Sequence, residues 1–123
     1  MADHQEIPGP VLAALQQRFP YAMNVKWEVE DDGYEAEFEF NGHEVEVEFD
    51  KDGNFRLKET AVPVEKLPED VKAALFEAFD TEVEITEAEL VETHDGRILY
   101  ELDIKLEVHV ESRFNVVAVG KDL

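Results

Sequence analysis

Carboxylates are the residues of this sequence best able to do chemistry, because 31 acidic residues stand against 11 lysines and arginines, for a formal net charge of −20. Between Tyr34 and Phe49, glutamates alternate with other residues on both sides of the dipeptide Asn41-Gly42. Carboxylates gathered on one surface can coordinate a hard cation, attract the lysines and arginines of another protein or, where burial raises a pKa, transfer protons.

A hairpin around Asn41-Gly42 would decide which of these glutamates face one another, since this dipeptide is the strongest short hairpin signal and sets Phe40 opposite His43. The register that follows pairs Glu39 with Glu44, Glu37 with Glu46, and Glu35 with Glu48. Like charges directly across a strand pair are destabilising, and Glu28 and Glu30 extend this acidic ladder on a neighbouring strand. We predict that the ladder binds a basic protein or peptide. The alternative is a solvated face that only keeps the protein in solution.

A second candidate site is the segment from Asp50 to Asn54, where Asp50 and Asp52 precede Gly53 as oxygen ligands do in the first half of a calcium loop. The distal bidentate glutamate of such a loop is missing, and Asp-Gly turns between strands are common. Calcium at Asp50 and Asp52 therefore competes with a purely structural turn, and no other cofactor is expected. The four histidines have none of the usual metal-ligand spacings; they are His4, His43, His94 and His109.

No part of the sequence has the pattern of a catalytic centre, so we predict that the protein is not an enzyme. Cysteine is absent, and Ser112 is the only serine and lacks a nucleophile motif. No glycine-rich loop is present that could cradle a phosphate. In so acidic a chain some pair of carboxylates must lie at any chosen separation, and such a pair indicates acid–base catalysis only where burial shifts a pKa.

The negative charge also excludes classes of partner, because nucleic acids and anionic membranes attract basic surfaces. No stretch approaches the ~18–20 apolar residues that span a membrane, and the first residues lack the basic and apolar regions of a signal peptide. An acidic mimic of nucleic acid that blocks a DNA-binding protein ranks last among the alternatives. The charge spacing along a strand does not obviously match the spacing of phosphates.

The elements that must position these residues come from an internal repeat, in which Ile7–Leu15 aligns with Leu67–Leu75 and Phe19 with Phe79. In each copy a proline opens a segment with one apolar stripe at helical spacing, and alternating segments separated by turns follow. The sequence therefore predicts an α+β protein. Two tandem helix-plus-antiparallel-meander repeats would form one curved antiparallel sheet, with both helices on its apolar face and the glutamates on the other.

The predicted organisation is a flexible tail over residues 1–6, a first repeat over 7–62 and a second repeat over 63–123, together one compact domain. The second copy differs in its middle, where alternation continues from Ile98 to Val110 without a turn residue. A strand over 98–110 would span about 43 Å. It would either bend over the core or pair with a second copy of the chain in a homodimer. Phe114, in a turn-like stretch, is a candidate aromatic anchor for a partner.

Three short sequence segments, together with the tandem pattern, resemble the PepSY-like family, which is named for its similarity to β-lactamase inhibitor proteins. They are Arg18-Phe19-Pro20, Val25-Lys26-Trp27-Glu28 and Phe49-Asp50-Lys51-Asp52-Gly53. The resemblance covers nearly the whole chain and is closer in the first copy, since Glu111-Ser112-Arg113-Phe114 has no counterpart of Gly53.

What the resemblance implies is an exported bacterial protein, periplasmic or secreted, that binds or inhibits another protein without catalysis. In the inhibitors a sheet face meets the enzyme, and here that face would be dominated by glutamates. The expected function is a non-enzymatic binding module that uses an acidic sheet face. The alternative is a calcium-binding acidic protein of the bacterial envelope.

Overall fold

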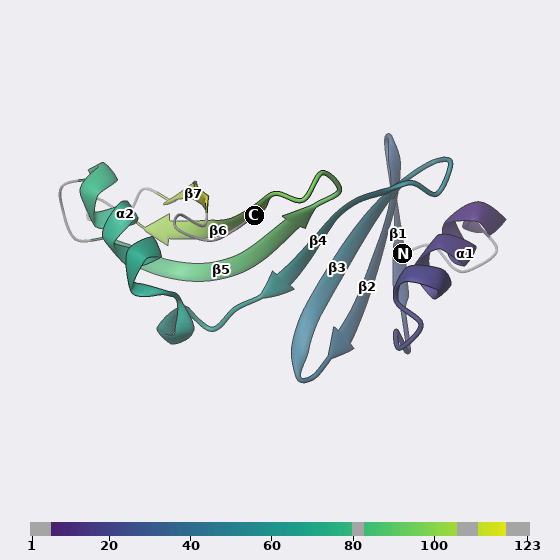
Figure 1. Ribbon diagram of the computed structural model, residues 1–123, viewed down its shortest axis with the longest axis horizontal. Coiled ribbons are helices and arrows are strands. Elements are labelled where there is room, and N and C mark those ends of the chain that lie inside the picture. Colours follow the sequence, from purple (N-terminus) through teal and green to yellow (C-terminus); the bar gives the residue numbers. More distant parts are fainter. Residues whose placement is uncertain (1–5, 80–82, 106–110, 118–123) are drawn as a thin grey trace. The chain divides into compact units, whose positions relative to one another are not determined.

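The computed structural model describes residues 6–79, 83–105 and 111–117. The chain divides into two compact units, with the boundary in the sequence between Thr60 and Ala61. Each unit contains a helix followed by antiparallel strands in sequential order (Figure 1). The predicted α+β class and the tandem helix-plus-meander architecture are confirmed. Neither helix within the described ranges has the length and hydropathy of a membrane span.

The first unit is a helix and a four-stranded meander, formed by α1 (Gly9–Arg18), β1 (Lys26–Glu30), β2 (Gly33–Phe40), β3 (His43–Asp50) and β4 (Phe55–Ala61). Helix α1 begins after its N-cap Pro8, and Pro10 lies in the first turn, where a missing N–H is not needed. It ends at Arg18; the C-cap residue Phe19 donates its backbone N–H to the carbonyl of Leu15, and Pro20 follows.

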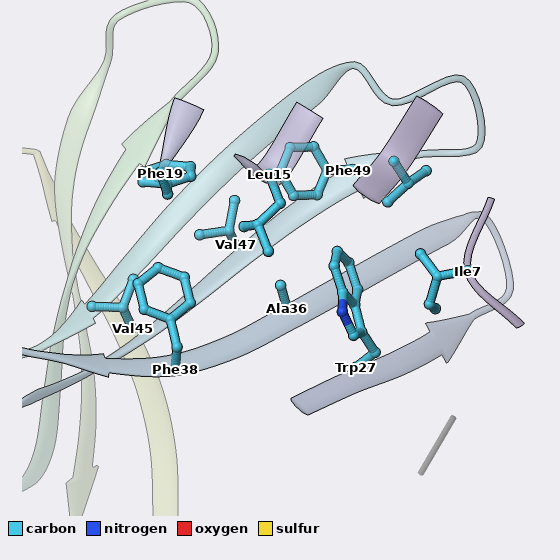
Figure 2. Packing of buried hydrophobic residues seen from close by; sticks show 10 residues of the cluster. Ile7, Leu15, Phe19, Trp27, Ala36, Phe38, Val45, Val47 and Phe49 are labelled. Carbon is cyan, nitrogen blue, oxygen red and sulfur yellow. The ribbon is translucent and has the colours of Figure 1, made fainter. Parts of the chain in front are cut away.

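The core of the first unit lies between α1 and one face of its sheet. Figure 2 shows Leu15 and Phe19 from the helix side facing Trp27, Val47 and Phe49 from the strands. Trp27 is 1% exposed, and Val47 and Phe49 are fully buried. Because side chains alternate between the two faces of a strand, filling this core with every second residue places the intervening glutamates on the opposite face.

The β2–β3 hairpin turns at Asn41 and Gly42, whose φ angles of 53° and 78° are those of the two-residue turn that the sequence predicts. Phe40 faces His43, and pairing continues without interruption to Gly33 and Asp50. The predicted register of this hairpin is confirmed.

The second unit repeats the plan with fewer strands among its described residues: η2 (Val64–Lys66), α2 (Glu69–Phe79), β5 (Glu84–Thr93), β6 (Ile98–Lys105) and β7 (Glu111–Val117). Helix α2 begins with Glu69 and Asp70, which complement the positive end of the helix dipole. Its buried residues Val71 and Leu75 pack in a separate core with strand residues such as Leu102 and Ile104.

The prediction of one uninterrupted strand over 98–110 is wrong. Strand β6 is described to Lys105, and residues 106–110 lie outside the described residues. Strand β7 pairs antiparallel with β6 and places Glu111 opposite Lys105, so the chain has reversed its direction by Glu111. Both strands of this hairpin alternate, and without a turn residue between them the sequence looks continuous. The homodimer through residues 98–110 stays a prediction.

Phe114 is also placed differently from its prediction as a free aromatic in a turn. It lies in β7 and is half-buried, and its ring meets that of Phe79 edge to face with centroids 5.4 Å apart. It packs against the core of the second unit and so has a structural role there, and its role as an anchor for a partner stays a prediction.

Candidate functional site

The face of the first unit opposite α1 carries glutamates from all four strands, in rows that cross the sheet. One row joins Glu28, Glu35 and Glu48, and a second joins Glu37, Glu46 and Glu59. We call the whole set the glutamate face; it consists of Glu28, Glu30, Glu35, Glu37, Glu39, Glu44, Glu46, Glu48 and Glu59. All three glutamate pairs expected across the hairpin are present. Glu59 is a member that the sequence analysis missed.

Three glutamates of this face, Glu35, Glu46 and Glu48, have pKa values above the usual one. Burial, followed by the charge of Glu46, raises the pKa of Glu35 to about 8. Burial also raises the pKa of Glu46 and of Glu48. The protonated carboxyl of Glu35 donates a hydrogen bond to the carboxylate of Glu46, so a single proton stabilises two carboxyl groups on adjacent strands.

The carboxylates are close enough to act together on one cation. Within each of three groups, the nearest carboxylate oxygens lie within 4.8 Å of one another; the groups are Glu30/Glu35/Glu48, Glu35/Glu46/Glu59 and Glu37/Glu44/Glu46. Three carboxylates this close can surround the ammonium group of a lysine or the guanidinium group of an arginine. They can also supply some of the 6–8 oxygen ligands that Ca²⁺ takes.

Among the described residues of the first unit, two cations lie over aromatic rings and two others act on the glutamate face. The guanidinium of Arg18 lies 4.0 Å from the centroid of the Phe55 ring, and the ammonium of Lys58 lies 5.7 Å from that of Phe19. Arg56 forms an ion pair with Asp32, with an N–O distance of 3.3 Å. Burial raises the pKa of Glu48, and the nearby charge of Arg56 partly offsets this. Lys26, which faces Glu37 at the start of β1, lies in a row of the glutamate face.

On the corresponding strands of the second unit, an arginine forms ion pairs with the acidic residues. Arg113 on β7 faces Asp103 on β6, with Nε 2.8 Å from Oδ1 of the aspartate. The same guanidinium lies 3.3 Å from Oε1 of Glu101. Its hydrogen bond lowers the pKa of Asp103. Facing acids occur on these strands too, with Glu87 opposite Asp103 and Glu89 opposite Glu101, but there Arg113 reaches one acid of each pair.

The predicted metal residues are the last residue of β3, Asp50, and Asp52 in the turn that follows, and neither belongs to the close carboxylate groups. The Asp50 carboxylate accepts hydrogen bonds from the backbone N–H of Asp52 and of Asn54, both at 2.9 Å, which lowers its pKa. Gly53 has a φ of 87°, and a Cβ there would lie 2.6 Å from the Pro10 carbonyl oxygen. These contacts give Asp50 a structural task in holding the turn beside α1.

The acidic pairs predict that salt stabilises the protein. Raising NaCl from about 0.02 to 0.5 M should raise the melting temperature by on the order of 3 °C, because each facing pair costs some tenths of a kcal/mol that salt screens. Thermal melts followed by circular dichroism measure this. The control variant Glu39→Lys faces Glu44 with an opposite charge and should respond less. A flat or falling melting temperature in the wild-type protein would contradict the repulsive ladder.

Comparison with known proteins gives a family and a fold. The family model described as "Putative beta-lactamase-inhibitor-like, PepSY-like" matches residues 2–56 and again residues 32–117. No functionally curated protein matches the chain.

Solved structures of Bacteroides proteins are similar over most of their length. A DUF2874 family protein of Bacteroides ovatus has a TM-score of 0.84 at 22% identity, covering 99% of this chain and 86% of that one. A "putative periplasmic" protein of Bacteroides eggerthii has a TM-score of 0.83 at 19% identity, with coverages of 94% and 84%. A BLIP-like protein of Bacteroides fragilis has a TM-score of 0.70 at 20% identity, with coverages of 94% and 89%. At these identities the likeness shows the fold.

Proposed function

The chain belongs to the PepSY-like, beta-lactamase-inhibitor-like family, and from this premise we propose that it is a non-enzymatic module that binds a basic protein or peptide through its glutamate face. The observation that carries the proposal is the contrast between the two copies. Arg113 forms ion pairs with Asp103 and Glu101 on the strands of the second unit, whereas nine glutamates from four strands gather on one face of the first unit, three pairs of them directly opposite.

A basic partner would change the sign of the interaction energy on this face. A glutamate pair in which both carboxyl groups are ionised is repulsive while water alone surrounds it, and a lysine or arginine between the two carboxylates is attracted to both. The net charge of −20 adds long-range steering, so association should be fast and sensitive to salt. Unsatisfied acidic pairs on a stable sheet are therefore suited to recognition of a cationic surface.

The location that fits this proposal is outside the cytoplasm, periplasmic or secreted. It is supported by the structurally similar Bacteroides eggerthii protein, whose description names the periplasm. The target of the module in that compartment is defined only by its chemistry, a surface or segment rich in lysine and arginine.

The test compares two variants that lose the same charge in different places. The face variant Glu37→Gln/Glu39→Gln/Glu44→Gln/Glu46→Gln removes four acids from the glutamate face. The control variant Glu65→Gln/Glu77→Gln/Glu84→Gln/Glu87→Gln removes four exposed acids from the second unit. The probe is a fluorescent twelve-residue peptide of alternating lysine and serine, titrated by anisotropy at about 0.05 and 0.3 M NaCl.

The face variant should bind this peptide at least about tenfold more weakly than the wild-type protein, because the lost contacts are local. The control variant should lose less than about threefold, since it changes only the distant field. Equal losses in the two variants would mean that net charge alone attracts the peptide, and the proposal of a binding face would fail.

A calcium-binding role is the second candidate, and the close carboxylate groups of the glutamate face favour it. It predicts a rise in melting temperature with about 1 mM CaCl₂ beyond that of NaCl or MgCl₂ at matched ionic strength, since ligand linkage at a micromolar site adds ~4 kcal/mol. Equal shifts from all three salts would leave only diffuse screening and remove this candidate.

A further inference from the structure

One end of the glutamate face borders an open cleft of about 520 Å³. Acidic side chains from β2 and β3 line one part of it, namely Glu37, Glu39 and Glu44. Met23, Lys26 and Phe38 line the other part. The cleft therefore combines apolar side chains with carboxylates, and all its lining residues belong to the first unit.

The cleft exists because β1 is shorter than β2. Pairing between these strands begins with Lys26 opposite Glu37, so among the described residues Phe38 to Phe40 of β2 have a strand neighbour on the β3 side alone. Before β1 the chain bends at Asn24, whose φ of 54° is in the left-handed region. The end of β2 is thus an open strand edge beside the cleft.

Exposed apolar side chains gather beside this open edge. Met23 is 71% exposed, Tyr21 41% and Phe40 39%. The rings of Tyr21 and Phe40 have centroids 4.1 Å apart, and Tyr21 also lies 6.3 Å from Phe38, which lines the cleft. Methionine and aromatic side chains exposed next to one another are typical of interaction surfaces, because they offer large contact area to a partner.

We propose that this cleft is the docking site for an extended segment of the basic partner in which lysine or arginine alternates with large apolar residues. The inference rests on the proposed function and names the segment that the glutamate face recognises. An extended strand presents successive side chains to opposite faces. At the edge of β2 one face offers Glu37 and Glu39, and the other offers Phe38 and the rings of Tyr21 and Phe40.

Charge complementarity and the open edge both favour this occupant. The basic side chains would lie among Glu37, Glu39 and Glu44, where Glu37 and Glu44 belong to one group of carboxylates within 4.8 Å. The apolar side chains would cover Met23 and Phe40 and remove their surface from water. An added strand can also form backbone hydrogen bonds with an uncovered strand edge, a common mode of peptide recognition.

The test uses two labelled seven-residue peptides of equal charge, one alternating lysine with leucine and one alternating lysine with serine. The wild-type protein should bind the lysine–leucine peptide at least about tenfold more tightly. The variant Met23→Ser/Phe40→Ser should reduce this preference to below about threefold and leave the affinity for the lysine–serine peptide unchanged. The matched control Phe76→Ser removes a side chain that is 60% exposed on the second unit and should keep the full preference.

The outcomes separate this inference from the proposed function. Equal affinities of the wild-type protein for the two peptides, or an unchanged preference in Met23→Ser/Phe40→Ser, would overturn the docking cleft and leave the glutamate face standing. If the wild-type protein bound neither peptide at about 0.05 M NaCl, both the docking cleft and the proposed function would be overturned. Circular dichroism spectra of the variants that match the wild-type spectrum exclude unfolding as the cause of a lost preference.

Discussion

Replacing Gly33 with alanine is expected to lower the free energy of unfolding of the first unit by about 3 kcal/mol. A Cβ at this position would lie 2.2 Å from the carbonyl oxygen of Phe49, far inside van der Waals contact, and 3.2 Å from Nη1 of Arg56. The carbonyl belongs to a strand paired on both sides, so it cannot move aside without disturbing the register of β2 and β3.

Thermal or urea unfolding followed by Trp27 fluorescence measures this effect, because Trp27 is the single tryptophan and is buried in the first unit. The melting temperature should fall by more than about 10 °C. The control is Gly9→Ala, where an added Cβ meets no atom within 4 Å. That variant should remain within about 0.5 kcal/mol of the wild-type protein. A Gly33→Ala variant as stable as Gly9→Ala would contradict the close approach of Gly33 to Phe49.

Lowering the pH from 8.5 to 6 is expected to stabilise the protein by roughly 2 kcal/mol. The folded state raises the pKa of Glu35 from its ordinary 4.5 to about 8. Between these values the folded chain keeps a proton that the unfolded chain releases, so the stabilisation is present at low pH and is lost as pH rises through about 8. Glu46 and Glu48 act in the same direction, and their partial exposure to water screens the total.

Urea denaturation at pH 6, 7, 8 and 8.5 measures this dependence above the range where aspartates titrate. The matched variant Glu35→Gln keeps a neutral hydrogen-bond donor for Glu46 and cannot lose a proton. It should equal the wild-type protein at pH 6, exceed its stability at pH 8.5 and have a flatter profile. Parallel pH profiles for the two proteins would show that Glu35 does not hold the proton.

The hairpin of the first unit is the part that sequence reasoning could predict in detail. The φ requirement of Asn41-Gly42 and the alternation on either side specify every pair from Phe40 and His43 outward. The helices were predictable for a related reason, since the apolar stripes of the two copies support each other. In these elements local turn chemistry and burial pattern point to the same answer.

The parts that could not be predicted depend on contacts between strands rather than on the pattern within one. A bulge between Glu48 and Phe49 shifts the register of β4, which is how Glu59 comes to face Glu46. The placement of Phe114 against Phe79 depends on the reversal between β6 and β7, which has no glycine, proline or asparagine to indicate it. The cleft beside Met23 depends on where β1 begins.

The two separate cores have a consequence for how this protein could have acquired its acidic surface. After an ancestral unit is duplicated, each copy inherits a complete set of apolar residues for its own helix and sheet. A substitution that destabilises one copy then leaves the core packing of the other copy unchanged. The copy that carries Arg113 is as acidic as the other, and the two differ in where their acids lie, because the first copy gathers nine glutamates on one face of its sheet.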